Sequence, residues 1–215
     1  GLVGSEMCIR DRVYFEGIDK ISPDDIDYGK QLNFVLKPLS VGMQNKDQIT
    51  LGSFPAFVKT DSLLASIQNE NNAVLVNAEN VGGTMYSGPG AGAKPTANSV
   101  LSDVIDIARG KIFDYGKFVQ QDLSSSFDNF SCDRYLKLQV NDKPGVVAKI
   151  STLLAKNNLS IDNLIQKELE RSDDQIPLVI VLSNSDETTI QETIKELEAL
   201  DEVSGPLTHI RILDI

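Results

Sequence analysis

Apolar and polar residues follow two different periods in residues 135–215. Segments of alternating or continuous apolar residues are separated by two segments with a 3.6-residue period, VVAKISTLLAKNN and ETTIQETIKELEAL. A period of two predicts strands, and a period of 3.6 predicts helices. The resulting order is βαββαβ, which is typical of the ferredoxin-like split βαβ fold with four antiparallel strands under two helices.

Residues 13–110 mix strands and helices in a different order. Ser22 followed by Pro23 and two acidic residues predicts the capped start of a short helix. Four segments predict strands, and a last helix is expected from Pro95–Thr96: the strand segments are NFVLKPLSVGM, ITLGSFPAFVK, NAVLVNAEN and GTMYSG. This mixture predicts an α+β protein in which a partial, mixed-sheet α/β domain precedes the βαββαβ domain. Residues 111–134 have no steady period and contain three consecutive serines, which predicts a linker.

Composition excludes several classes of function. The net charge of −11 leaves no basic surface for nucleic acid. Cys8 and Cys132 do not have metal-ligand spacing, so we expect no zinc site, and this cysteine usage suits the reducing cytoplasm. The single histidine, His209, lies in a strand pattern and is expected to face solvent, not to form a catalytic triad. No segment approaches the about 18 apolar residues of a membrane span, and no signal-peptide pattern is present.

The first twelve residues, GLVGSEMCIRDR, have neither periodicity nor turn chemistry. They resemble translated sequencing-adapter read-through. We expect residues 1–12 to be a non-native leader and exclude them from the fold.

A glycine-rich loop joins a predicted strand to the last helix of residues 13–110. Its sequence is YSGPGAGAKPTANSV, and a strand, glycines and a helix N-terminus together form a geometry that favours anions. Gly88, Gly90 and Ala93 fit the spacing GxGxxA, but no acidic residue ends a strand about 20 residues later, as a dinucleotide fingerprint requires. From these residues alone, a ligand-contacting loop and a tight structural turn remain equally open.

Three segments resemble one enzyme family. ENVGGTMYSGPGAGAKPTANSVLSDVIDIARG is similar to the closing segment of the homoserine dehydrogenase catalytic region, and VYFEGIDKISPDDIDYGKQL is similar to an earlier segment of it. YLKLQVNDKPGVVAKISTLLAKNNLSI resembles the ACT domain that bacterial members append. For Glu16, in the earlier segment, strand-end polarity is favoured over a place near the active-site entrance.

The resemblance implies a function and its cofactor. The family interconverts aspartate 4-semialdehyde and homoserine with NAD or NADP, on the route to threonine, methionine and isoleucine. It implies that Gly90, Ala91 and Gly92 line a secondary wall of the cofactor site. The family's nucleotide fingerprint, substrate-binding carboxylates and catalytic lysine precede the segments matched here, so no catalytic residue is expected in this chain. We expect it to be an N-terminally truncated fragment without dehydrogenase activity of its own.

The ACT resemblance implies an effector site in residues 135–215. The turn from Asn141 to Gly145 would meet a partner subunit and bind an amino acid, with threonine the first candidate. The helix after Gly145 would take the ligand carboxylate, and Asp142 or Asn163 its ammonium group. We therefore expect a homo-oligomer. The alternatives are that the turn only starts a helix, and that the protein is a non-enzymatic amino-acid sensor in which the ACT half alone functions.

Overall fold

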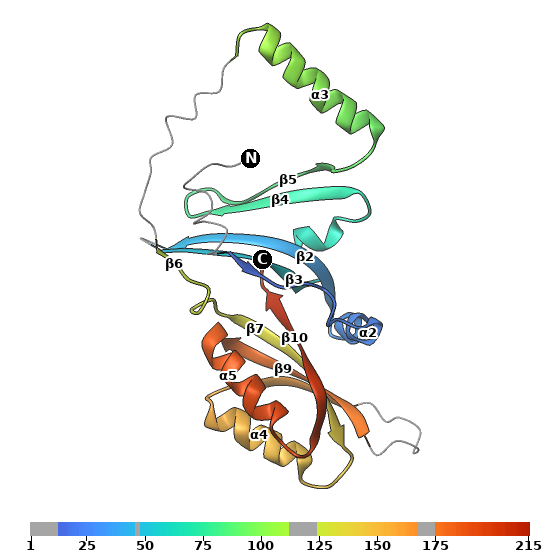
Figure 1. Ribbon diagram of the computed structural model, residues 1–215, viewed down its shortest axis with the longest axis vertical. Helices are drawn as coiled ribbons and strands as arrows, with labels where there is room; N and C mark the ends of the chain where they lie inside the picture. The colour runs from blue at the N-terminus through green and yellow to red at the C-terminus, as the bar shows by residue number, and fades with distance from the viewer. Residues whose placement is uncertain (1–12, 46–47, 112–123, 167–174) are drawn as a thin grey trace. The chain divides into compact units, whose positions relative to one another are not determined.

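The computed structural model describes residues 13–45, 48–111, 124–166 and 175–215 (Figure 1). The chain divides into two compact units, which we describe separately. Among the described residues, the first unit contains 13–59 and 124–214, and the second contains 60–111 and Ile215. The predicted leader, residues 1–12, lies outside the described residues, as do residues 112–123 of the predicted linker.

The first unit is built on one large mixed sheet (Figure 1). The strands run in the order β1-β3-β10-β7-β9-β8, and β2 and β6 also pair with β3. Its elements are β1 (Tyr14–Phe15), α2 (Pro23–Gln31), β2 (Phe34–Asn45), β3 (Gln48–Lys59), β6 (Ser124–Ser125), β7 (Cys132–Asn141), α4 (Val146–Lys156), β8 (Ile161–Gln166), β9 (Gln175–Ser185), α5 (Glu187–Glu198) and β10 (Val203–Leu213). The predicted α+β class with a mixed sheet is confirmed.

The βαββαβ order predicted for the C-terminal part is present. Strands β10, β7, β9 and β8 are neighbours and antiparallel. Helices α4 and α5 bury their apolar stripes on one face of these strands, where Ile150, Leu154 and Ile190 pack against Leu136 and Ile180. Asp186 caps α5 by accepting a hydrogen bond from the Thr189 N–H at 2.8 Å.

The opposite face of the same four strands is also covered from within the chain. Tyr28 of α2 and Phe57 of β3 form a buried cluster with Tyr135, Val181 and Ile210. The hairpin of β2 and β3 and helix α2 thus cover this face with their own large apolar side chains.

Strand β10 extends its sheet through β3. The two strands are parallel, with Arg211 opposite Ala56 and Leu213 opposite Val58. The end of the predicted linker is folded as well, since β7 begins at Cys132 and Phe130 is buried. The first unit therefore joins parts of both predicted domains, 13–110 and 135–215, because this strand pairing crosses the boundary between them.

Helix α2 begins as its residues predict. Ser22 is the N-cap and Pro23 the first helical residue. The Asp25 carboxylate accepts hydrogen bonds from the Ser22 backbone N–H at 2.8 Å and the Ser22 hydroxyl at 2.7 Å. The bond from the Ser22 N–H to Asp25 belongs to a capping box, which fixes the direction in which the helix leaves the loop after β1.

The second unit contains a short 3₁₀ helix, a hairpin and one long helix. They are η1 (Leu63–Ser66), β4 (Asn71–Ala78) paired antiparallel with β5 (Gly82–Pro89), and α3 (Ala93–Ala108). Helix α3 begins two residues before the predicted start. None of its residues is buried, and Val100, Leu101, Val104 and Ile107 are all more than half exposed.

Candidate functional site

The glycine loop lies between β5 and α3, as predicted. The Gly90 N–H donates to the carbonyl of Glu70 at 2.7 Å, and Gly92 is the N-cap of α3. The backbone N–H and the hydroxyl of Thr96 both donate to the Gly92 carbonyl, at 3.2 and 2.8 Å. The loop is thus a defined strand-to-helix turn.

Two glycines of the loop occupy positions where the local structure disfavours a side chain. A Cβ on Gly90 would lie 1.9 Å from Nδ2 of Asn72, and Gly92 has a φ of 116° that side-chain-bearing residues rarely adopt. The backbone angle favours glycine at Gly92, whereas at Gly90 the contact is with the end of the Asn72 side chain, which can move aside. Neither glycine is independent evidence for a ligand.

The surface of this loop nevertheless suits contact with a ligand. Residues 87–94 are exposed, and Gly90, Ala91 and Gly92 present backbone with almost no side chain. Pro95 has no N–H and the Thr96 N–H is already used, so the first turn of α3 offers the N–H groups of Ala93 and Lys94. These residues fit a wall that a dinucleotide could approach closely. They do not form a full phosphate cradle.

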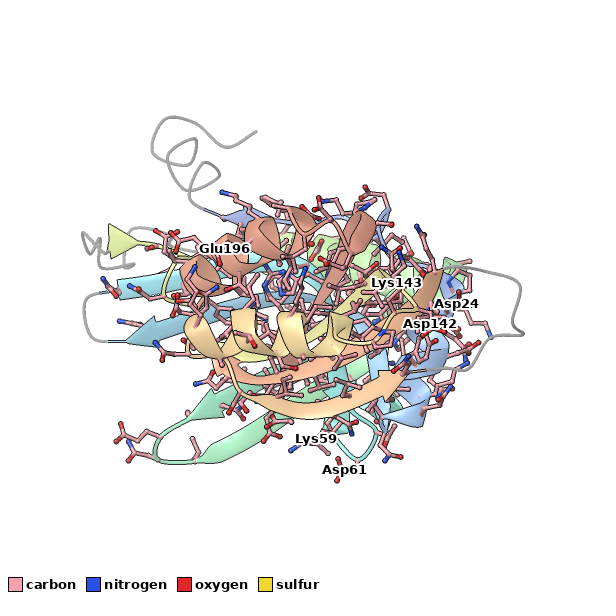
Figure 2. All side chains as sticks on the ribbon, turned by 90° about the horizontal axis from the view of Figure 1, so that it is seen from below. Asp24, Lys59, Asp61, Asp142, Lys143 and Glu196 are labelled. Carbon is pink, nitrogen blue, oxygen red and sulfur yellow. The ribbon has the colours of Figure 1, made fainter. Side chains whose placement is uncertain are left out.

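The predicted effector turn lies at the end of β7. Asn141 is held by its N–H donating to the Glu202 carbonyl at 2.9 Å, and Asp142 and Lys143 are exposed side by side (Figure 2). Gly145 caps α4 with a φ of 94°, and no atom lies within 4 Å of the Cβ it lacks. The turn therefore leaves the N-terminus of α4 open.

Asn163 does not lie beside this turn in the same chain. It pairs with Val181 of β9, whereas Asn141 pairs with Gln175 of the same strand. Six residues of extended strand span about 20 Å. The structure therefore separates Asn163 from Asn141, Asp142 and Gly145 within one copy.

A buried charge cluster that sequence reasoning missed lies between the ACT-like strands and the segment after β1. Arg211 donates to both oxygens of Glu187, from Nη2 at 2.5 Å and from Nε at 3.2 Å. It also donates to Glu16 from Nη1 at 2.5 Å. Arg134 donates to Glu187 at 2.8 Å and to two backbone carbonyls, those of Phe130 and Ser185. Both arginines are fully buried.

The cluster controls protonation of its members. Burial alone would raise the pKa of Glu187, but the hydrogen bond and charge of Arg211, together with the charge of Arg134, hold that pKa below its usual value. Arg211 keeps its proton despite burial because Glu187 and Glu16 raise its pKa. Glu187 and Arg211 are therefore both charged at neutral pH.

A second polar cluster ties α2 to β7. Asp25 is fully buried and accepts a hydrogen bond from the Tyr135 hydroxyl at 2.9 Å, while the Lys137 ammonium lies 2.8 Å from it. The Lys137 ammonium also donates to the Ser22 hydroxyl at 2.7 Å. Burial and the neighbouring Asp25 carboxylate raise the pKa of Tyr135. The cluster fixes the capped end of α2 on the ACT-like sheet.

One signal in the sequence could have found the buried arginines. Arg134 and Arg211 each occupy a position whose neighbours two residues away are buried or partly buried, as in RYLKL and HIRIL. A charged residue on the inward face of a strand is rarely buried without a partner. The partners could not be read from the sequence, because Glu187 is 53 residues from Arg134, and Glu16 is 195 residues from Arg211.

His209 is only partly exposed, whereas the sequence predicted that it would face solvent. Its Nε2 atom is buried and has no hydrogen-bond partner among the described residues. Burial and the nearby Arg211 charge lower the pKa of His209 well below its ordinary value. Cys132 is buried too, and burial raises the pKa of its thiol to about 11, so it is not a reactive thiolate.

Comparison with known proteins identifies both halves of the chain. Residues 2–105 match the homoserine dehydrogenase family profile, and residues 134–202 match the ACT domain profile. The first match includes most of the predicted leader. The chain is 35% identical to homoserine dehydrogenase of Pseudomonas aeruginosa over 94% of its own length and 49% of that protein. The chain is homologous to homoserine dehydrogenase.

Further relatives agree with this homology. Homoserine dehydrogenase of Neisseria gonorrhoeae is 38% identical, with 93% of this chain and 48% of that protein covered. The crystal structure of a homoserine dehydrogenase from Thiobacillus denitrificans superposes with a TM-score of 0.82 at 29% identity, covering 95% of this chain and 48% of that one. The chain spans about half the length of the homoserine dehydrogenases it matches. No helix in the described part of the chain is long and apolar enough to cross a membrane.

Proposed function

We propose that this chain is part of a homoserine dehydrogenase that interconverts aspartate 4-semialdehyde and homoserine with NAD or NADP in the cytoplasm. The observation that carries the proposal is 35 to 38% identity to two such enzymes across more than nine-tenths of the chain. The cofactor would accept or donate the hydride. The pathway would be that of threonine, methionine and isoleucine.

In this proposal the chain supplies part of the cofactor wall and no catalytic group. Gly90, Ala91 and Gly92 are assigned to the wall, supported by their exposure at the start of α3. A side chain at Gly92 would project from the loop where the dinucleotide approaches. The 215 residues alone are expected to be inactive.

A chimera tests the enzymatic proposal. The half of the Pseudomonas aeruginosa enzyme that this chain does not match is joined to residues 13–215, and NADH or NADPH oxidation is followed with aspartate 4-semialdehyde. We expect activity from the chimera and none from the 215 residues. Gly92→Val should raise the KM for the cofactor at least tenfold. Gly82→Val is the matched control, because Gly82 also has a positive φ but is the first residue of β5, at the other end of that strand from the glycine loop.

Three results would contradict parts of this proposal. Activity of the 215 residues alone would refute their predicted inactivity. Equal kinetics of the chimera with and without the Gly92→Val substitution would remove the loop from the cofactor site. An inactive, folded chimera that still binds an amino acid would favour the alternative, a non-enzymatic ACT regulatory protein.

We further infer that the ACT half binds a pathway amino acid, threonine first, between two copies of the chain. Asn141, Asp142 and Gly145 of one copy would face Asn163 of the other. The separation of about 20 Å along β9 within one copy supports a shared site, because one small amino acid cannot span it. Strand β8 pairs with β9 alone among the described residues, which leaves its outer edge for a second copy.

Mixing two variants tests whether the site is shared. Threonine at 100 times its Kd should stabilise the full chain by about 2.7 kcal/mol, seen as a rise in Tm. Asp142→Ala and Asn163→Ala should each abolish the rise, whereas Asp24→Ala, an exposed carboxylate on α2, should keep it. After refolding as a mixture, the two variants that do not bind threonine alone should regain threonine binding in mixed dimers, where one of the two sites has both native residues.

The mixture separates the possible outcomes. Absence of recovery would refute a shared site, even if each variant alone loses binding. A monomer whose Tm does not change with millimolar threonine, methionine, isoleucine or lysine would refute the effector proposal altogether.

A further inference from the structure

Arg211 joins two carboxylates that come from opposite ends of the chain. Glu187 is the first residue of α5, in the ACT domain, and Glu16 follows β1, in the part related to the homoserine dehydrogenase catalytic region. The guanidinium group uses two nitrogens for Glu187 and the third for Glu16. All three nitrogens are thus engaged at once.

The surroundings hold this group in one position. The guanidinium carbon lies 4.6 Å from the ring centroid of Tyr14, 4.7 Å from that of Phe54 and 5.3 Å from that of Phe127. Tyr14 also donates a hydrogen bond to Glu16 at 3.1 Å. The planar guanidinium group of Arg211 has few alternative positions between these aromatic rings, because the protein interior is closely packed.

A displacement of either carboxylate therefore strains or breaks a buried ion pair with Arg211. If the first turn of α5 moves, Glu187 either takes Arg211 with it or leaves a buried guanidinium group short of its partner, which is strongly unfavourable. Movement of Arg211 in turn changes its hydrogen bond to Glu16, whose backbone N–H is held by the Ser53 carbonyl at 3.0 Å. Arg134 fixes Glu187 from the ACT side at 2.8 Å.

Helix α5 is exposed to external contacts at its other end. A groove on the outer surface of the helical layer is lined by Lys149, Thr152 and Lys156 of α4 and by Glu196 and Leu200. Any molecule that occupies this groove contacts α5. The buried end of the same helix begins at Glu187.

We propose that Arg211 is a coupling residue through which a displacement of helix α5 changes the conformation of residues 14–19. The ACT domain would thereby act on the catalytic-region segment through one buried ion-pair bridge. The proposal concerns this chain by itself and does not depend on which effector binds.

Amide hydrogen exchange in the full chain tests the coupling from both sides. Glu187→Gln should speed exchange of the Glu16 amide at least tenfold relative to the Ile180 amide, which lies in β9 between β7 and β8 and reports global stability because the residue is fully buried. Glu196→Gln is the matched control, since it removes an exposed carboxylate from the same helix and should leave the ratio unchanged. In the opposite direction, Glu16→Gln should speed exchange of the Thr189 amide by a similar factor, because coupling is reciprocal.

Each outcome decides the proposal. If Glu187→Gln does not fold, Glu16→Gln carries the test, because its carboxylate is 23% exposed and the substitution is milder. Arg211→Lys keeps the charge but cannot bind both carboxylates through a planar guanidinium group. It should abolish the effect of Glu16→Gln on exchange of the Thr189 amide. If each substitution changes only the amides beside it, or if Glu196→Gln acts as strongly as Glu187→Gln, Arg211 is a structural ion pair and the coupling is refuted.

Discussion

The two compact units differ in how many of their apolar side chains they bury. The first unit buries three clusters of side chains and holds its charges in the networks around Arg211 and Asp25. In the second unit, Ala65 is the single buried apolar residue among those described, and α3 exposes its whole apolar stripe. Period alone thus predicts a helix equally well in both units, but only one unit supplies its own covering surface.

This difference implies that the free energy of unfolding is concentrated in the first unit. Exposed apolar stripes of the kind seen on α3 mark surfaces that other protein segments or partners cover. The following predictions, made for the full 215-residue chain, test that contrast in order of decreasing effect.

Removal of the central charge of the first unit should have the largest effect. Arg211→Met leaves Glu187 and Glu16 without a shared cation in a buried site, which typically costs about 3–5 kcal/mol. Lys30→Met is the matched control, because its ion pair with Asp27 is about two-thirds exposed and should contribute less than about 1 kcal/mol. Urea unfolding followed by circular dichroism measures both. Equal losses would mean that the buried bridge adds no more than a surface pair.

Truncation of isoleucine to alanine should lower the free energy of unfolding in the first unit but not in the second. Ile180→Ala removes a fully buried side chain from the ACT-like core and should cost about 2–5 kcal/mol. Ile107→Ala in α3 removes a side chain that is 75% exposed, and alanine is the better helix former, so the main unfolding transition should not shift. Urea midpoints of the two variants provide the comparison. A loss at Ile107 as large as that at Ile180 would show that α3 is packed in solution.

The fold could be predicted from the sequence wherever local patterns determine the type and the start of an element. The βαββαβ order follows from period, and the start of α2 follows from Ser22 and Pro23. The pairing of β3 with β10 could not be predicted, because parallel pairing between segments about 150 residues apart leaves no local pattern. That pairing in turn places Glu16 beside Arg211.

The candidate sites were predictable to different degrees. The glycine loop and the Asn141–Gly145 turn are found at helix N-termini as expected, because glycine and proline determine such turns locally. Their ligands stay predictions. The burial of the His209 Nε2 atom was not predicted, since alternation alone does not say that both faces of β10 are covered.

Acidification should lower the stability of the first unit in a pH range that is set by the protonation of His209. The unfolded chain binds a proton there near pH 6.5, whereas the folded chain keeps the ring neutral to much lower pH because burial lowers the pKa. Stability is therefore complete above about pH 6.5 and falls below it, by at most about 1.4 kcal/mol per pH unit. The Glu187 contribution is lost only as the pH falls below about 4.5, because the pKa of that carboxyl is lowered on folding.

One substitution isolates this histidine, which is the single one in the sequence. His209→Leu should remove most of the loss of stability between pH 6.5 and 5.5, measured as urea midpoints at each pH. An unchanged slope would assign the acid sensitivity to carboxylates and contradict the burial of a neutral ring.

The smallest effects should come from the two glycines that cap helices with positive φ, one in each unit. Gly145→Ala forces a φ near 94° on a residue with a side chain and should cost about 1 kcal/mol, with no steric clash added because no atom lies within 4 Å of the new Cβ. Gly145→Asn should cost less, since asparagine tolerates this conformation better. Gly92→Ala meets the same backbone strain at a φ of 116° but should leave the main urea transition unchanged, because the second unit buries too little to contribute to it. If Gly92→Ala shifts the transition as much as Gly145→Ala, the two units unfold together and exposure of α3 does not report its stability.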